Sequence, residues 1–182
     1  MAKRLTPEDW IAAGFRALAQ DGPDAIKAEK LARQLGTSKG SFYWHFKDVP
    51  AFHAAMLALW EEQSLHAITS ALAELPTPHE RIRALAKRAS SPAPERFGGL
   101  KVEPAIRAWS IQNPQVAQGV AKVDAGRMAY LRGQLRAAGK DENLATLVYC
   151  TYLGQDDLLA RDGTTDDGSM LKVVEMILGD EG

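Results

Sequence analysis

The chain has 182 residues, of which 46% are hydrophobic and 25% charged, with a formal net charge of −1 and a pI near 6.4. This composition is ordinary for a globular protein and argues against both intrinsic disorder and indiscriminate nucleic-acid binding. No apolar run approaches the roughly 18 residues of a membrane span and no secretory leader is recognisable, so we expect a cytoplasmic protein with no membrane partner.

The first predicted element is a helix that begins after Thr6 and ends before the breaker Asp21-Gly22-Pro23. Thr6 is a good N-cap and Pro7 suits the first helical position. Glu8 stands one position short of the capping-box spacing, so a capping box would have to use Asp9. Both acids face the positive end of the helix dipole. The helix carries an apolar face of Trp10, Ile11, Phe15 and Leu18.

The stretch from Ala28 to Lys47 contains two short helical patterns separated by Gly36. Glycine stops the first helix because it adopts positive φ without a Cβ clash. Thr37 and Ser38 then supply N-cap oxygens for the second helix. With the first helix, the two patterns predict a small core of Ile11, Phe15, Leu18, Leu31, Leu35, Phe42 and Phe46.

Two helices joined by a short turn with glycine are typical of a helix-turn-helix. In the second helix Phe42 and Phe46 share one face, while Lys39 and Tyr43 share another. Gly40 costs roughly 1 kcal/mol relative to Ala inside a helix, and close approach of the helix backbone to a DNA strand would explain it.

The run from Ser38 to Lys47 also closely resembles the recognition-helix signature of the TetR (tetracycline repressor) family of transcriptional regulators. The resemblance implies an all-α protein with a three-helix helix-turn-helix head over residues 1–47. Residues 48–182 would form a C-terminal helical bundle for effector binding and dimerisation. By resemblance and geometry we expect Lys39, Ser41 and Trp44 to contact base edges, Tyr43, His45 and Lys47 to contact phosphate, and Ser38 to do either.

Lys27 stands where TetR-like sequences place a Thr or Ser that opens the second helix and touches phosphate. Lysine can reach a phosphate but cannot cap a helix, so the cap is expected to be missing. Residues 1–50 hold 8 Lys and Arg against 6 Asp and Glu, a local excess of +2. Lys39, His45 and Lys47 fall on one helix and its exit and form a basic edge, and we expect Asp21 and Asp24, in an earlier turn, to point away from it.

The remaining segments also read as helices. Asp48 is the N-cap of a predicted long helix that ends near Leu75 and would be about 40 Å long. It would connect the head to the second domain without a flexible linker. The later predicted helices cover residues 79–89, 102–112, 115–138, 141–159 and 166–178, and residues 91–99 form a loop.

The last two predicted helices carry broad apolar faces, with more apolar surface than packing against one side of a small bundle would bury. Burial in a homodimer would use the surplus, and the resemblance implies a four-helix dimer interface. The alternative is that both faces are intrachain core. They comprise Leu144, Leu147, Val148, Tyr152 and Leu153 in one helix, and Leu171, Val174, Met176, Ile177 and Leu178 in the other.

Large aromatic and sulfur-containing side chains gather in the second domain. They either line a cavity for an apolar or aromatic effector or form ordinary core. The candidate pocket comprises Met56, Trp60, His66, Trp109, Met128, Tyr130, Tyr149 and Tyr152. Arg107, Asp124 and Arg127 are interpreted as an ionic cluster, with an anion clamp as the alternative.

No motif for catalysis, a cofactor or a metal is recognisable. Glu62 and His66 lie four apart, but no second pair at ligand spacing accompanies them, and Cys150 is the single cysteine. We therefore expect no enzyme activity, no cofactor and no metal.

These patterns predict a dimeric, sequence-specific transcriptional regulator, most simply a repressor that a small effector releases from a palindromic DNA operator. One alternative is a dimeric DNA-binding regulator without an effector. The other is a helical small-molecule carrier or enzyme with a vestigial head.

Overall fold

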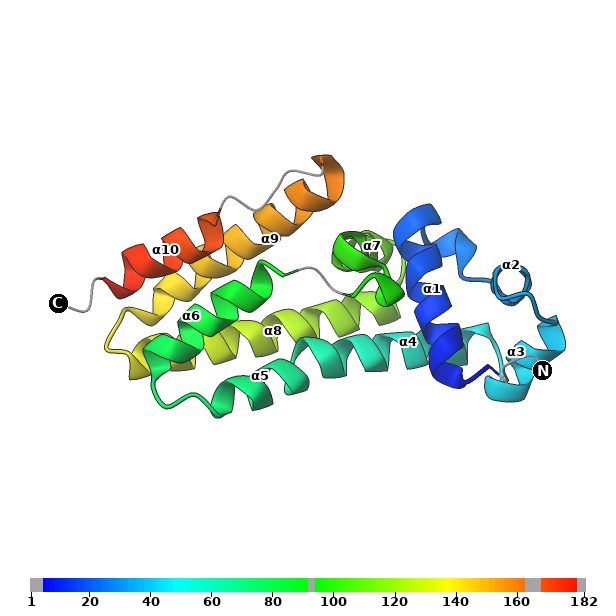
Figure 1. The fold of residues 1–182 in the computed structure, drawn as a ribbon, viewed down its shortest axis with the longest axis horizontal. Coiled ribbons are helices and arrows are strands. Elements are labelled where there is room, and N and C mark those ends of the chain that lie inside the picture. The colour runs from blue at the N-terminus through cyan, green and yellow to red at the C-terminus, as the bar shows by residue number, and fades with distance from the viewer. Residues whose placement is uncertain (1–4, 92–93, 163–167, 180–182) are drawn as a thin grey trace. The chain divides into compact units, whose positions relative to one another are not determined.

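The structure is a computed structural model that describes residues 5–91, 94–162 and 168–179 (Figure 1). All regular structure in these ranges is helical, with no strand, which confirms the predicted all-α class. The α-helices are α1 (Pro7–Asp21), α2 (Ala28–Gln34), α3 (Lys39–His45), α4 (Val49–Ser64), α5 (His66–Ala73), α6 (Pro78–Ala89), α7 (Val102–Ser110), α8 (Pro114–Ala137), α9 (Ala145–Asp162) and α10 (Ser169–Leu178). Short 3-10 helices are η1 (Pro23–Ala25), η2 (Glu95–Phe97), η3 (Gly99–Lys101) and η4 (Glu142–Leu144). None of the described helices is long and apolar enough to cross a membrane.

Capping boxes start two of the helices. The Asp9 N–H donates to Thr6 Oγ1 at 3.2 Å, and Asp9 Oδ2 accepts from the Thr6 N–H at 2.9 Å, so Asp9 completes the first box. The same arrangement joins Thr77 and Glu80 at the start of α6. Each box satisfies two backbone donors that the first helical turn leaves without partners.

The single helix predicted from Asp48 to about Leu75 is wrong, because α4 and α5 are separate helices. The backbone of Leu65 leaves the helical region, with φ −120° and ψ −70°. Its side chain packs directly on α8: a Cβ built at Gly126 would lie 2.8 Å from Leu65 Cδ2. The Asp48 cap is confirmed, since the Ala51 N–H donates to Asp48 Oδ1 at 2.7 Å. With 16 residues, α4 alone is about 24 Å long.

The other predicted helices are confirmed within a few residues at their ends. The predicted 91–99 loop contains η2 and the start of η3, while residues 92–93 lie outside the described residues. The predicted 141–159 helix begins with η4 and continues as α9. The last helix begins at Ser169, and the predicted start at residue 166 lies outside the described residues.

The chain divides into two compact units, Met1–Trp60 with Ala93–Val120 and Glu61–Pro92 with Ala121–Gly182. The division falls inside α4 and inside α8. The first unit includes α7 because α7, η2 and η3 all pack against α1. The functional boundary predicted after Lys47 remains a prediction.

Aromatic side chains form the core of the first unit. Trp10, Phe42, Phe52 and Met56 have no exposed surface, and the Trp10 and Phe42 rings meet edge to face with centroids 5.3 Å apart. Gly14 allows α1 to approach α4 closely, because a Cβ there would lie 2.7 Å from Phe52 Cζ.

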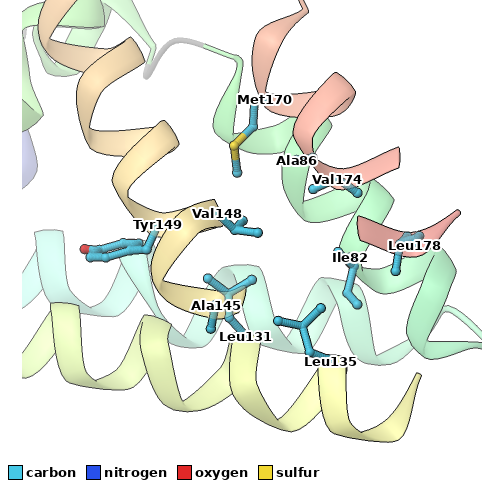
Figure 2. Close-up of a cluster of buried hydrophobic side chains, with 10 residues drawn as sticks. All are labelled: Ile82, Ala86, Leu131, Leu135, Ala145, Val148, Tyr149, Met170, Val174 and Leu178. Atoms are coloured by element: carbon cyan, nitrogen blue, oxygen red, sulfur yellow. The ribbon is translucent and has the colours of Figure 1, made fainter. Parts of the chain in front are cut away.

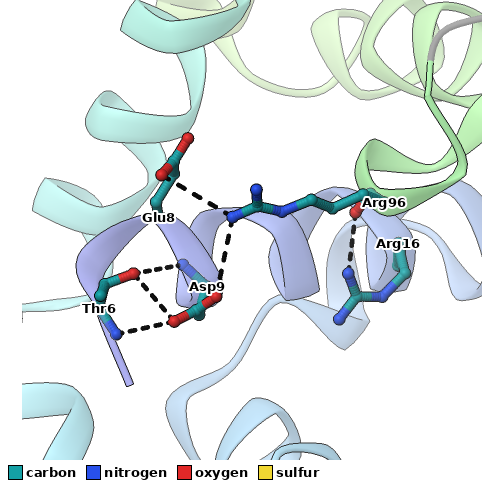
Figure 3. Close-up of polar contacts among 5 residues, drawn as sticks. All are labelled: Thr6, Glu8, Asp9, Arg16 and Arg96. Carbon is teal, nitrogen blue, oxygen red and sulfur yellow. Dashed lines mark hydrogen bonds and ion pairs between the residues drawn. The ribbon is translucent and has the colours of Figure 1, made fainter. Parts of the chain in front are cut away.

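Polar contacts also hold the segment before α7 against α1 (Figure 3). Arg16 Nη1 donates to the Arg96 carbonyl oxygen at 2.8 Å. The Arg96 guanidinium lies 3.8 Å from Glu8 Oε2 and 3.7 Å from Asp9 Oδ1. These ion pairs are partly exposed and contribute little stability, so they mainly orient the segment.

In the second unit, α6, α8, α9 and α10 meet around one apolar core (Figure 2). Its buried side chains are Ile82, Ala86, Leu131, Leu135, Ala145, Val148, Tyr149, Met170, Val174 and Leu178. Much of the apolar surface predicted on the last two helices is therefore intrachain core. Leu147 and Met176 remain 52% and 84% exposed, and Leu158 of α9 is 49% exposed.

Candidate nucleic-acid interface

The turn between α2 and α3 has the geometry predicted for a helix-turn-helix. α2 ends at Gln34, and Gly36 follows with a φ of +63°. The Thr37 N–H then donates to the Ala32 carbonyl at 2.9 Å, which closes the turn. Ser38 caps α3, because its Oγ accepts from the Ser41 N–H at 3.3 Å. The predicted positions of the glycine and of the cap are confirmed.

Two phenylalanines anchor α3. Phe42 is fully buried and Phe46 is 8% exposed. The Phe42 ring lies 5.2 to 5.3 Å, between centroids, from the rings of Trp10, Phe46 and Phe52. The rest of the predicted core is buried, except Leu35, which is half-buried. The face of α3 that carries these phenylalanines is therefore packed against the core and holds the helix in place.

The opposite side of α3 is open. Tyr43 is 45% and Trp44 69% exposed. Ser38, Lys39, Gly40 and Lys47 are exposed, and Ser41 and His45 are half-buried. A Cβ built at Gly40 would meet only Ser38 Oγ, at 3.6 Å, so no packing within the described residues requires this glycine. Most of the predicted DNA-contacting side chains are thus accessible on α3, with Ser38 at its N-cap and Lys47 just beyond its end.

Two of the three predicted lysine contacts are already paired with carboxylates. Lys39 Nζ of α3 forms a close ion pair with Glu29 Oε1 of α2, and Lys27 Nζ lies 3.0 Å from Asp24 Oδ1. Hydrogen bonding to Glu29 raises the pKa of Lys39, and hydrogen bonding to Lys39 lowers the pKa of Glu29. The Lys27 hydrogen bond likewise lowers the pKa of Asp24. Asp24 therefore offsets the charge of Lys27. The expectation that Asp21 and Asp24 point away from Lys39, His45 and Lys47 stays a prediction.

Lys27 is the N-cap residue of α2 but makes no side-chain cap hydrogen bond, as predicted. The role of Glu29 was not predicted from the sequence. Glu29 and Lys39 are ten residues apart on two helices, a separation that helical periodicity within one element does not reveal.

The candidate effector residues of the first unit are packed and bonded. Met56 is fully buried against Gly14. The Trp60 indole N–H donates to Glu103 Oε2 at 3.0 Å, and Glu103 Oε1 accepts from Arg107 at 2.9 Å. The Trp109 ring meets His53 edge to face, with centroids 4.9 Å apart.

His53 itself connects α4 to the segment before α2. Its Nε2 lies 3.2 Å from the Ile26 carbonyl oxygen, to which it donates when protonated at that nitrogen. Burial lowers the pKa of His53, and the Ile26 hydrogen bond opposes that shift.

The candidate effector residues of the second unit have different environments. Tyr149 belongs to the buried core, and its OH donates to Asp124 Oδ1 at 2.6 Å. Tyr152 stacks on Tyr149 at a centroid distance of 5.9 Å and lies under the Arg127 guanidinium. Met128 packs at the edge of this core, whereas His66 is exposed. Arg107 of the first unit pairs with Glu103, and the predicted ionic cluster with Asp124 and Arg127 stays a prediction.

Tyr130 of α8 differs from the other candidates. Its hydroxyl oxygen is buried and has no hydrogen-bond partner among the described residues, and the same holds for Gln134 Oε1 one turn later. Burial raises the pKa of Tyr130, and the Arg81 charge opposes that shift. A buried polar atom without a partner is costly, so each such atom is a candidate contact for water or ligand.

Within the described ranges, no three His, Cys, Asp or Glu side chains are placed to hold a metal ion. Cys150 is exposed and forms no disulfide.

Comparison with known proteins matches residues 11–48 to the family model described as bacterial regulatory proteins, tetR family. No curated protein sequence matches the chain. A transcriptional regulator from Rhodococcus sp. is similar in structure, with a TM-score of 0.75, 19% identity and coverage of 96% and 95% of the two chains. A protein from Saccharomonospora viridis in complex with choline is also similar, with a TM-score of 0.77, 16% identity and coverage of 93% of both chains. The regulator FadR from Bacillus subtilis in complex with stearoyl-CoA has a TM-score of 0.71 and 17% identity, and the match covers 96% of this chain and 98% of that one. At these identities the structural matches show a shared fold.

Proposed function

Because residues 11–48 carry the N-terminal domain of the TetR family of bacterial regulatory proteins, we propose that the chain is a dimeric, sequence-specific transcriptional repressor. The observation that carries this proposal is the open surface of α3, with Tyr43 and Trp44 exposed above a fully buried Phe42. Exposed aromatic side chains next to lysines suit a surface that contacts DNA bases and phosphates. Regulators of this family are generally non-enzymatic, and we propose no catalytic role.

The dimensions of α3 support docking in the DNA major groove. An α-helix with its side chains is about 10–12 Å in diameter, which fits a major groove about 12 Å wide, and the seven residues of α3 give it a length of about 10 Å. A helix this short reaches only a few base pairs. A second copy that binds the other half of a palindrome would supply the missing specificity, with the two half-sites about 34 Å apart.

We propose that the homodimer forms through α9 and α10. Leu147 and Leu158 of α9 and Met176 of α10 are exposed apolar side chains on these helices, and burial in a second copy would remove them from water. Sedimentation at micromolar concentration checks this step. A dimer is expected, and a monomer would contradict it.

We further propose that a small apolar or aromatic molecule, bound within residues 48–182, releases the protein from its operator. The fold is shared with proteins whose structures hold choline and stearoyl-CoA. In this chain, Tyr130 and Gln134 offer buried oxygens that a ligand with a polar group could satisfy. A thermal-shift screen, followed by operator release, would identify such a molecule.

A regulator without an effector is the second candidate. It is favoured by the packing of several predicted pocket residues, because Trp60 and Tyr149 are buried with their polar atoms hydrogen-bonded. A screen in which no compound raises the melting temperature or releases DNA would favour this candidate.

Selection of bound duplexes from a random library tests DNA binding and half-site symmetry together. We expect enrichment of a palindromic sequence. Recovery of unrelated sequences, or of no DNA, would contradict the proposed function.

A further inference from the structure

The ion pair between Glu29 and Lys39 is placed where a recognition helix meets base edges. Lys39 is the first residue of α3, and Glu29 lies in the first turn of α2. In helix-turn-helix proteins the N-terminal residues of the second helix contact the bases. Both side chains are half exposed, at 50% for Lys39 and 58% for Glu29. They are therefore accessible to a partner.

The pair is poorly suited to either of the two ordinary roles of surface charges. An exposed ion pair adds little stability. A lysine that contacts phosphate is most effective as an uncompensated cation, whereas a carboxylate beside it repels the DNA backbone. With Glu29 next to Lys39, the start of α3 presents almost no net charge but offers hydrogen-bond donors and an acceptor side by side.

That arrangement complements one base pair. In the major groove a G·C pair presents two acceptors, guanine N7 and O6, followed by one donor, the cytosine amino group. The Lys39 ammonium has three donors, of which the bond to Glu29 Oε1 uses one, so two remain for guanine. The second Glu29 oxygen can accept from cytosine. Lys39 Nζ also lies 5.8 Å from the Tyr43 ring centroid, which favours keeping the ammonium at this end of the helix.

We propose that Glu29 and Lys39 act as one unit that reads a G·C base pair in each half of the operator. Lys39 donates to guanine, and Glu29 accepts from the cytosine amino group while holding the ammonium in place. Glu29 is then a specificity-determining residue, because it also weakens attraction to the phosphates of unrelated DNA. This inference rests on the proposed function.

The test measures dissociation constants by fluorescence anisotropy at one fixed salt concentration. The duplexes are the selected operator and variants in which each base pair of the half-site is changed in turn, with an unrelated duplex alongside. The proteins are the wild type, Glu29→Gln, Lys39→Ala and Glu74→Gln. Glu74 is an exposed carboxylate at the end of α5, so its variant changes net charge equally, away from the candidate interface.

The wild type is expected to lose about tenfold in affinity when one G·C pair per half-site becomes A·T. Glu29→Gln should lose most of that preference while keeping the others, and should bind the unrelated duplex several-fold more tightly. Lys39→Ala should lose preference at the same position, and Glu74→Gln should match the wild type. Matching urea midpoints for Glu29→Gln and the wild type would show that the variant is folded.

If Glu29→Gln keeps the wild-type preference at every position, or gains affinity for all duplexes equally, the inference is overturned. In either case the selected operator still binds, so the proposed function stands. A wild type that selects no sequence would instead defeat the proposed function itself.

Discussion

Removal of the Phe42 ring should detach the recognition helix from the core. The ring is fully buried, and its centroid lies 5.2 to 5.3 Å from those of Trp10, Phe46 and Phe52. Phe→Ala changes in cores cost about 3–5 kcal/mol, and edge-to-face ring pairs contribute about 0.5–1.5 kcal/mol each beyond burial. We expect Phe42→Ala to lower the free energy of unfolding by about 4 kcal/mol.

Urea titration followed by far-UV circular dichroism measures this loss. The matched control is Tyr43→Ala, because Tyr43 is the next residue and is 45% exposed. The control should lose only about 0.5–1 kcal/mol. A loss below about 1 kcal/mol for Phe42→Ala, or equal losses for both variants, would refute the anchoring argument.

Three further predictions follow from charge and burial. Lys47→Ala should weaken binding to all duplexes alike and reduce the slope of log affinity against log salt concentration by about 1. An unchanged slope would show that Lys47 does not contact phosphate. Tyr130→Phe should leave stability unchanged or raise it by about 1 kcal/mol at pH 7, since it removes a buried hydroxyl without a partner among the described residues. Because burial raises the pKa of Tyr130, the wild type should also lose stability above about pH 10, where its unfolded phenol ionises, and more than the variant does. If melting temperatures show instead that Tyr130→Phe is destabilised by more than about 1 kcal/mol, the hydroxyl has a partner. Burial lowers the pKa of His53, so wild-type stability should fall as pH drops below about 6.5, where the unfolded state takes up the proton first. His53→Gln should show a weaker fall in urea titrations at pH 7.5 and 5.5, and parallel curves would contradict this.

Local signals in the sequence were sufficient for most helix limits. Thr6, Gly36 and Ser38 each satisfy a requirement of the backbone itself, a capped donor or a positive φ, so their roles could be predicted without tertiary contacts. The Thr77 and Glu80 capping box carries the same signal in the sequence, and it was missed.

Features that depend on packing between elements could not be predicted. The break at Leu65 accompanies contact with Gly126, which is 61 residues away, and nothing in the local pattern signals it. The Glu29 and Lys39 pair likewise requires the angle between two helices. Composition also could not separate pocket from core, since Tyr149 and Tyr130 look alike in the sequence but only Tyr149 has a partner for its hydroxyl among the described residues.

The central claim is that the surface from Ser38 to Lys47 contacts duplex DNA. Amide hydrogen exchange of the wild-type protein, measured with and without the selected duplex, tests it most directly. We predict that the largest slowing of exchange on DNA addition falls on residues 38–47 and the start of α2. Unchanged exchange in residues 38–47, with slowing confined to α9 and α10, would contradict the claim.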